Sequence, residues 1–459
     1  MTIPALAVRT GLDARQWQIW EDRAVQWLGE VLRIDTTNPP GNEGLCADWV
    51  QKTLSQYGVS SQRYELVPGR GNVVARLQGH GAGKDHDPLL LTAHMDVVPH
   101  DRRFWTQDPF GGAVVDGWMY GRGAVDMKYM LIENLVSFLA LRESGIKLKR
   151  DVIFLALADE EAGCEHGARF MVSKHPETIR ARWGINELGG FPIYVGKQQR
   201  KAYLVQTAEK GLAWLRIRIP GTPGHGSLVQ GDNPVSKAAA VVSALQKGVH
   251  PHTVTPAARD FINGLAAQAG AVGAVLKMLL NPLTYGVAHG LVPDASQRNV
   301  FRAVLHNTAN PTVFHGGLKV NVVPSEVVIE VDGRTLPGQT TESFVAPIRA
   351  ILPEGSQIEI ISEGPPYVVP ASGALWDQIG AVLNEADPGA AVIPYLMSGF
   401  SDSKYLGQLG ADIYGFAPVH FPPDVALTSL VHGHDERIPV DGFRWGARAH
   451  YETVARFCS

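Results

Sequence analysis

The sequence predicts an α/β domain with a mostly parallel central sheet and helices on both faces, interrupted by an α+β module with an antiparallel sheet. In the first part of the chain, helical segments alternate with strands that are apolar throughout, as buried parallel strands are. From about residue 209 the strands alternate apolar and polar residues, and the first pattern returns from about residue 366. The length of 459 residues suits two or three domains. We therefore predict one domain from residues 1–209 and 366–459, and an inserted domain from residues 210–365.

The N-terminal part begins with two predicted helices. The first is indicated by apolar residues at helical spacing, namely Trp17, Trp20, Ala24, Trp27, Leu28, Val31 and Leu32. The stretch "DTTNPPGNE" ends it, because its two prolines and its glycine interrupt a helix. A second helix is predicted through residues 47–57, and a later, long helix stops at Gly145. Three strands are predicted in the same part of the chain: "NVVARLQG" (72–79), "DPLLLTAHMDVV" (87–98) and "RDVIFLALADEEAG" (150–163).

The inserted module has the alternation of a sheet with one exposed face. Strands are predicted for "GLAWLRIRIPG", "EVVIEVDGRTLPG" and "IEIISEG", and a helix for "NPVSKAAAVVSALQ". Residues 255–300 include "GLAAQAGAVGAVLKMLLNPL", an apolar helical stretch rich in small residues. This stretch is either a packing face or the wall of an apolar pocket, and we favour packing.

Composition argues against several classes of function. The net charge is -4 and no basic block is present, so we expect no nucleic-acid partner. The chain lacks a run of about 18 apolar residues and begins without a signal-peptide pattern, so we expect no membrane partner. Cys46, Cys164 and Cys458 lie far apart, which is typical of reduced thiols. A cytoplasmic location is therefore expected.

Polar side chains follow two of the apolar strands. The stretch "LLLTAHMDVVP" passes from three leucines to His94 and Asp96, and "LADEEAG" ends the later strand with Glu160 and Glu161. In open α/β sheets, ligands gather outside the carboxyl ends of the strands. Because carboxylates at the end of a buried strand lose hydration, they need a cation or hydrogen-bond donors nearby. These strand ends therefore predict a functional site.

Other acids and histidines complete a candidate metal site. Asp126 lies in "GRGAVDMK", Glu187 in "GINELGG", and His432 in "LVHGHDER". Imidazole nitrogens and carboxylate oxygens suit zinc, and one carboxylate can bridge two ions about 3.5–4 Å apart. The dispersed cysteines exclude a zinc site of four thiolates. Each motif alone has an ordinary structural explanation, but their occurrence together favours a metal centre.

The motifs "TAHMDVVP", "GRGAVDMK", "ADEEAG", "GHGS" and "HGHDER", in this order, resemble the M20 family of zinc metallopeptidases. That family includes aminoacylases, carboxypeptidases, dipeptidases and deacylases, and the likeness covers nearly the whole chain. It implies a zinc-peptidase-like catalytic domain with a ferredoxin-like lid. It also implies hydrolysis of an amide bond beside a free carboxylate in N-acyl amino acids or short peptides. Alternatives are a dipeptidase, a succinyl-type deacylase, or an inactive metal-binding homologue. The intact "DEE" argues against the inactive homologue, which would be expected to have lost the catalytic base.

The resemblance also implies a cofactor of two zinc ions, with cobalt or manganese as alternatives. In the family pattern, one ion would be bound by His94 and Glu187, and the other by Glu161 and His432. Asp126 would bridge them and be followed by a cis peptide bond. The first histidine of "HGHDE" is the family ligand, which selects His432 over the second histidine.

The resemblance gives Glu160 the role of general base, since Glu161 would be committed to metal. Zinc lowers the pKa of a bridging water to about 7, and Glu160 would finish its deprotonation. The resulting hydroxide would attack the scissile carbonyl, and Glu160 would pass the proton to the leaving nitrogen. Asp96 would accept the other imidazole N–H of His94 and so fix that ring.

The likeness extends to residues that would meet the substrate. His225 in "GTPGHGS" resembles a histidine that stabilises the oxyanion and that comes from the partner subunit in dimeric members. Asn321 and Arg334 resemble residues that grip the substrate carboxylate, and Gly399 belongs to a substrate-facing loop. His225, Asn321 and Arg334 could equally be ordinary turn residues. A homodimer through the lid is one expectation, but a lid this long could instead cover the site within one chain. Its apolar face could favour bulky apolar acyl groups.

Overall fold

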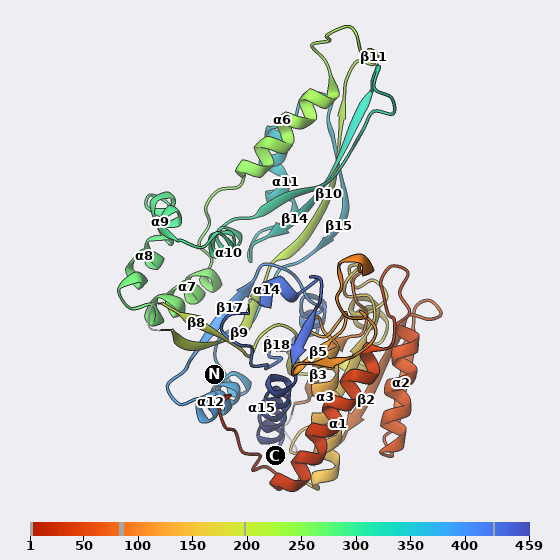
Figure 1. Cartoon of the computed structure of the whole chain (residues 1–459), viewed down its shortest axis with the longest axis vertical. Coiled ribbons are helices and arrows are strands. Elements are labelled where there is room, and N and C mark those ends of the chain that lie inside the picture. The colour runs from red at the N-terminus through yellow and green to blue at the C-terminus, as the bar shows by residue number, and fades with distance from the viewer. Residues whose placement is uncertain (1–2, 82–86, 197–198, 426) are drawn as a thin grey trace.

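Two large β-sheets form the framework of the protein. The structure is a computed structural model, which describes residues 3–81, 87–196, 199–425 and 427–459. A ten-stranded sheet lies in the body of the molecule, at the bottom of Figure 1. A four-stranded sheet lies in an elongated lid above it.

The large sheet has the strand order β1-β2-β6-β3-β7-β18-β9-β16, with β17 and β8 also paired to β9. Its centre is parallel, because β6, β3, β7 and β18 run in the same direction, as β17 and β9 do. The remaining pairings are antiparallel, so the predicted mostly parallel sheet is confirmed at its centre and mixed at its edges. The strands are β1 (Ser61–Glu65), β2 (Gly71–Leu77), β3 (Leu89–His94), β6 (Val152–Leu157), β7 (Trp183–Asn186), β8 (Phe191–Val195), β9 (Arg200–Glu209), β16 (Tyr367–Val368), β17 (Ala391–Met397) and β18 (Asp412–Gly415).

Helices cover both faces of this sheet, as predicted. Every residue of β3 and β6 is buried, because alternate side chains pack against helices on opposite faces. One face carries α1 (Ala14–Leu32), α2 (Glu43–Gln56), α3 (Lys128–Ser144), α12 (Ala374–Ala386) and α15 (Val440–Cys458). The other carries α4 (Ala168–Lys174), α5 (Pro176–Ile179) and α13 (Ser403–Leu406). The body also contains α14 (Leu427–Leu430) and a small sheet of β4 (Val114–Val115), β5 (Trp118–Tyr120) and β19 (Arg437–Pro439).

The lid sheet is antiparallel throughout, in the order β12-β14-β10-β15. One face packs against α6 and α11, and the chain order of strands and helices is that of a ferredoxin-like module. A short ribbon of β11 (Gly224–His225) and β13 (Val322–Val323) projects at the far end of the lid (Figure 1). The main elements are β10 (Gly211–Pro220), α6 (Pro234–Lys247), β12 (Thr308–Gly316), β14 (Glu326–Thr335), α11 (Thr341–Ala350) and β15 (Gln357–Gly364).

The chain changes from one sheet to the other at two short connections. Lys210 alone separates β9 of the large sheet from β10 of the lid sheet. Pro365 and Pro366 separate β15 from β16. Both connections lie beside the boundaries placed at 209/210 and 365/366, and the division into two domains stays a prediction.

The apolar stretch at 255–300 packs against the body, although its sequence lies within the insert. It forms α7 (Pro256–Gln268), α8 (Gly273–Met278), α9 (Tyr285–Leu291) and α10 (Ala295–Leu305). Phe261 and Leu265 of α7 join one apolar cluster with Leu204 of β9 and Ile393 of β17. A Cβ atom at Gly264 would lie 2.6 Å from Cγ2 of Ile393, so a small residue permits this close approach. This observation supports packing as the role of the segment. Among the described residues, no helix combines the length and the apolar character that crossing a membrane requires.

Candidate metal centre

Three neighbouring strands bring the expected ligands to one edge of the large sheet. His94 ends β3, Glu160 and Glu161 follow β6, and Glu187 follows β7. Since β6, β3 and β7 are adjacent and parallel, their carboxyl ends meet. Asp126 joins them from the turn before α3, across a cis bond to Met127, as the family resemblance implied.

Asp126 lies between two histidines that are far apart in the sequence. Its Oδ1 is 3.2 Å from Nε2 of His94, and its Oδ2 is 3.2 Å from Nε2 of His432. Glu161 Oε2 lies 3.2 Å from the same His432 nitrogen, while Glu187 Oε2 lies 3.7 Å from Nε2 of His94. The structure thus brings together all five expected ligands, in the two groups that two metal ions would need. Their role as ligands stays a prediction.

The buried acids of this cluster fit a cation. Oε1 of Glu161 and Oε1 of Glu187 are buried with no hydrogen-bond partner among the described residues. Burial raises the pKa of Glu161 to about 7 and that of Glu187 to about 7. Burial opposes ionisation of Asp126 too, but hydrogen bonds with His432 and His94 hold its pKa below the usual value. A divalent cation between such oxygens would favour their ionised forms, and imidazole with carboxylate is a donor set that zinc takes.

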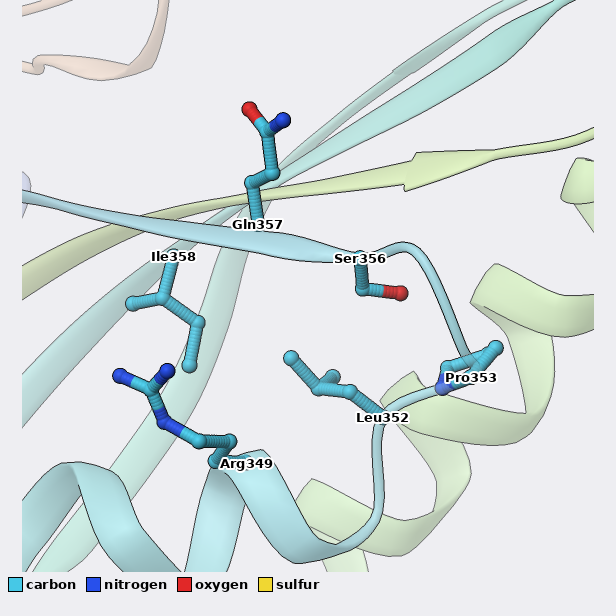
Figure 2. A pocket seen from close by; sticks show the side chains of 6 residues that line it. All are labelled: Arg349, Leu352, Pro353, Ser356, Gln357 and Ile358. Atoms are coloured by element: carbon cyan, nitrogen blue, oxygen red, sulfur yellow. The ribbon is translucent and has the colours of Figure 1, made fainter.

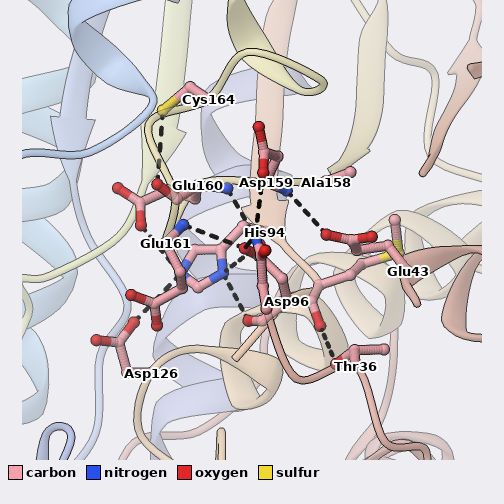
Figure 3. Close-up of polar contacts among 12 residues, drawn as sticks. Thr36, Glu43, His94, Asp96, Asp126, Ala158, Asp159, Glu160, Glu161 and Cys164 are labelled. Atoms are coloured by element: carbon pink, nitrogen blue, oxygen red, sulfur yellow. Dashed lines mark hydrogen bonds and ion pairs between the residues drawn. The ribbon is translucent and has the colours of Figure 1, made fainter. Parts of the chain in front are cut away.

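Asp96 holds two parts of the cluster in place (Figure 3). Its carboxylate accepts the backbone N–H groups of Glu160 and Glu161, each at 3.1 Å, and the side-chain N–H of Asn38 at 2.8 Å. Nδ1 of His94 lies 3.0 Å from the carbonyl oxygen of Asp96 and 3.3 Å from its Oδ1. Asp96 therefore lies where it can orient the His94 ring, and it also fixes the turn that carries both glutamates.

Glu160 is buried at the side of the cluster, and one ligand atom from each of His94, Glu160 and Glu187 lies within 4.8 Å of the others. Its Oε2 lies 4.0 Å from Nε2 of His94, farther than the oxygens of Asp126 or Glu187. Burial, and then the charge of Glu187, raise the pKa of Glu160 well above the usual value. Cys164 packs behind it, with Sγ 3.8 Å from the Glu160 carbonyl oxygen, and burial raises the pKa of that thiol. Cys164 is therefore a packed, fully buried side chain.

The model for Peptidase family M20/M25/M40 matches residues 90–456. The chain belongs to this family. Aminoacylase-1 of Sus scrofa is 26% identical over 448 residues, which cover 96% of this chain and 96% of that protein. The N-fatty-acyl-amino acid synthase/hydrolase PM20D1 of Xenopus tropicalis is 27% identical over 404 residues, covering 85% of this chain and 76% of that protein.

The fold agrees with that of solved M20 structures. The M20 family metallo-carboxypeptidase Sso-CP2 of Sulfolobus solfataricus superposes with a TM-score of 0.72 at 17% identity, covering 95% of this chain and 99% of that one. Membership makes this protein an M20 hydrolase that acts on amide bonds of small amide or peptide substrates. Family and geometry together indicate that it uses metal ions.

Two residues of the M20 lid lie far from the metal centre of their own chain. His225 in β11 and Asn321 beside β13 are both exposed at the far end of the lid, where the backbone N–H of Gly226 donates to the Asn321 carbonyl at 2.9 Å. Figure 1 shows β11 at the opposite end of the lid from the body. Within one chain, the lid therefore does not place His225 or Asn321 over the metal centre.

Arg334 lies beside the loop that carries Gly399, at the base of the M20 lid. The guanidinium of Arg334 on β14 lies 4.8 Å from the ring centroid of Phe400, which follows Gly399 in the loop after β17. Its Nε and Nη2 donate to the carboxylate of Asp332, at 2.7 and 3.1 Å. Nη1 is buried and has no hydrogen-bond partner among the described residues. Arg334 thus retains a donor beside the loop that the sequence assigned to the substrate.

Sequence reasoning did not assign roles to several residues that support the M20 centre. Glu436 accepts hydrogen bonds from the backbone around Asp126, and its signal was present in the "HGHDER" motif. The Asn38 side chain donates to Asp96 and, at 3.0 Å, to Asp159, and the Asn-Pro-Pro turn was its only signal. Arg70, which pairs with Asp159 at 2.6 Å, had none.

A pocket of about 570 Å³ in the lid lies between the end of α11 and β15 (Figure 2). Its lining consists of Arg349, Leu352, Pro353, Ser356, Gln357 and Ile358. These residues include no acid and no imidazole, so the pocket offers no metal ligands and is separate from the centre described above.

Proposed function

We propose that this M20 protein hydrolyses the amide C–N bond beside a free carboxylate, in N-acyl amino acids or short peptides, with two divalent metal ions, zinc foremost. The observation that carries the proposal is the position of Asp126, 3.2 Å from each of two imidazoles that belong to opposite ends of the chain. A carboxylate in that position is suited to bridging two ions.

The residues that would hold the ions are His94, Asp126, Glu161, Glu187 and His432. When bound, the ions would polarise the scissile carbonyl and make water more acidic. Asp96 would keep His94 oriented and the Glu160–Glu161 turn fixed, because it contacts both.

Glu160 would move the proton. It is buried, and its Oε2 lies 4.0 Å from Nε2 of His94, compared with 3.2 Å for Asp126 and 3.7 Å for Glu187, so it would be the acid left free to accept a proton from the attacking water. It would then deliver the proton to the leaving nitrogen. Its position supports an active hydrolase over an inactive metal-binding homologue.

Arg334 would bind the free carboxylate of the substrate. A planar guanidinium suits a carboxylate, and its Nη1 lacks a partner among the described residues. Gly399 would leave room for the substrate at the same loop. Asn321 would assist only if it reached the site from another chain.

We propose that the functional unit is a homodimer formed through the lid, in which His225 of each chain serves the other's site. The far end of the lid exposes a set of apolar side chains, which such contacts would cover: Leu228, Val229, Phe314, Leu318, Val320 and Val322. The distance of His225 from the centre of its own chain is the reason that a partner is needed.

N-acyl amino acids are favoured over dipeptides because the chain matches both an aminoacylase and an N-fatty-acyl-amino acid hydrolase over most of its length. A succinyl-type deacylase or a dipeptidase is the alternative. The test is release of free amino acid from acetyl, succinyl, long-chain and aromatic N-acyl amino acids and from dipeptides, with and without a chelator. Hydrolysis that a chelator does not reduce would overturn the metal-dependent mechanism, and a preference for dipeptides would favour the alternative substrate.

A further inference from the structure

Glu436 gathers the backbone of the turn that carries Asp126. The side chain is fully buried, and its Oε1 accepts the N–H groups of Val125 at 2.7 Å and Asp126 at 3.0 Å. Its Oε2 accepts the N–H of Gly123 at 3.2 Å and Nη1 of Arg122 at 2.6 Å. Four donors from one turn therefore converge on one carboxylate that belongs to the His432 segment.

Arg122 makes the reverse connection. Its Nη2 donates to the carbonyl oxygens of His432 at 3.4 Å and Gly433 at 3.1 Å. The guanidinium is almost fully buried and lies 5.2 Å from the ring centroid of Trp105. Each member of the Arg122–Glu436 pair thus holds the backbone of the other's segment, and the two segments are joined from both sides.

The Arg122–Glu436 pair lies on the His432 side of the centre, where the sheet does not fix the ligands. The His94 and Glu187 side chains are buried at the ends of strands in the middle of the sheet. The His432 side chain is 50% exposed and lies outside the sheet, so packing alone does not fix it. The distance between Asp126 and His432 therefore depends on contacts between their two segments, and Arg122 and Glu436 supply them.

We propose that Arg122 and Glu436 are positioning residues for the metal ion that Asp126, Glu161 and His432 would share. Loss of the pair should weaken that ion most, because His432 would bind only that ion, whereas Asp126 would contribute to both ions. Residues that orient metal ligands commonly change affinity by about 10–100-fold when they are replaced. The inference rests on the proposed two-metal function and adds to it two residues that would keep the ligands of one ion together.

The experiment is calorimetric titration of the full-length, metal-free protein with Zn²⁺. The wild-type protein should bind two ions. In Glu436→Gln, the new amide N–H group would face other donors. This variant should bind the ion of Glu161 and His432 about 10–100-fold more weakly than the wild type, and should lose less affinity for the ion of His94 and Glu187. Glu452→Gln is the matched control, because Glu452 is also a fully buried glutamate that accepts several hydrogen bonds. It lies on α15 and accepts from the backbone N–H groups of Arg9 and Thr10 and from Nε of Arg456. This control should bind both ions like the wild type.

Arg122→Lys keeps a positive charge beside Glu436 but loses the second branch of the guanidinium, so it should also weaken the ion of Glu161 and His432. Thermal melting checks that each variant folds. If Glu436→Gln does not fold, the titration of Arg122→Lys tests the positioning role instead. Two ions bound with wild-type affinity by a folded variant would overturn the positioning role alone. Failure of the wild-type protein to bind two ions would instead overturn the proposed function.

Discussion

Glu160 and Glu161 are neighbours with identical side chains, yet the fold gives them different surroundings. Both backbone N–H groups are held by Asp96, so the two side chains leave one fixed turn in different directions. Glu161 reaches within 3.2 Å of His432, whereas Glu160 comes no closer than 4.0 Å to His94. This difference supports one as a metal ligand and the other as a proton carrier.

Replacement of Glu160 should separate these two roles. Glu160→Gln keeps the shape but removes the proton acceptor, so we expect kcat to fall by about 10²–10⁴-fold while both metal ions remain bound. Steady-state kinetics and metal content measure the two effects. Glu161→Gln should instead reduce metal content. A Glu160→Gln protein with wild-type kcat would remove Glu160 from its role.

The buried acids should make the metal-free protein sensitive to pH. Burial raises the pKa of Glu161 and of Glu187 to about 7, from 4.5 for an unperturbed carboxyl. The folded state therefore holds more protons than the unfolded chain in this interval, and its stability falls as the pH rises through it. Hydrogen bonds to Asp126 and Glu161 raise the pKa of His432 to about 10, which extends the loss above neutrality.

Thermal melting of the metal-free and zinc-loaded protein tests this pH dependence. We expect Tm of the metal-free protein to be lower at pH 8 than at pH 6, and the increase in Tm caused by Zn²⁺ to be larger at pH 8. An equal zinc-induced increase at both pH values would show that the acids of the centre do not titrate as described.

The sequence could predict the principal residues of the site because each sits in a motif at the end of an element. It could not predict Arg70 or the function of Glu436, because their partners lie elsewhere in the chain. A buried ion pair has no periodicity, and only the folded chain shows which charges meet.

At the scale of elements, Lys210 joins the two sheets and also secures the helical segment. Its ammonium group donates to the carbonyl oxygens of Ala303 and His306 and to the hydroxyl of Thr308, at 2.9, 2.9 and 3.0 Å. These acceptors lie at the end of α10 and the start of β12. The single residue between β9 and β10 therefore also fixes a second connection between lid and body.

Lys210→Met should leave these buried acceptors without their donor. We expect the free energy of unfolding to fall by about 1–3 kcal/mol, measured by urea denaturation. Lys277→Met, at an exposed position of α8, is the control and should change it little. A Lys210→Met protein as stable as the wild type would show that water replaces the ammonium group without cost.

Element types could be predicted where residue periodicity is clear. The continuous apolar runs of β3 and β6 and the alternation of β10 and β14 identify buried and half-buried strands. The antiparallel edges of the large sheet could not be predicted, because a strand's own pattern does not specify the direction of its neighbour.

At the scale of the whole molecule, the proposed dimer makes a prediction about mixed proteins. Glu160→Gln and His225→Ala should each be inactive alone. In a mixed dimer, the His225→Ala chain would keep its Glu160 and receive His225 from its partner. Random exchange should therefore restore about a quarter of wild-type activity, as one active site in half of the dimers.

Activity assays before and after exchange of subunits, with sedimentation to measure mass, test this expectation. Val229→Asp, at the exposed end of the lid, should yield monomers with low activity. An active monomer, or mixtures that stay inactive although dimers exchange, would contradict the shared site.

The insertion of a lid could be predicted from the change of pattern near residues 209 and 366. The position of α7 could not be predicted, because its apolar face could pack against the lid as well as against the body. Its contact with β17 joins residues more than 100 positions apart, which no local pattern reveals.

The place of α7–α10 on the body has a consequence for any attempt to shorten the chain. Because these helices return to the body midway through the insert, the polypeptide crosses between the two parts at Lys210, at 248–255, at 306–307 and at Pro365–Pro366. Excision of residues 210–365 would therefore remove the helices that bury Leu204 and Ile393 and expose an apolar surface to water. A minimal catalytic unit would have to retain the helical segment, spliced directly to the end of β9.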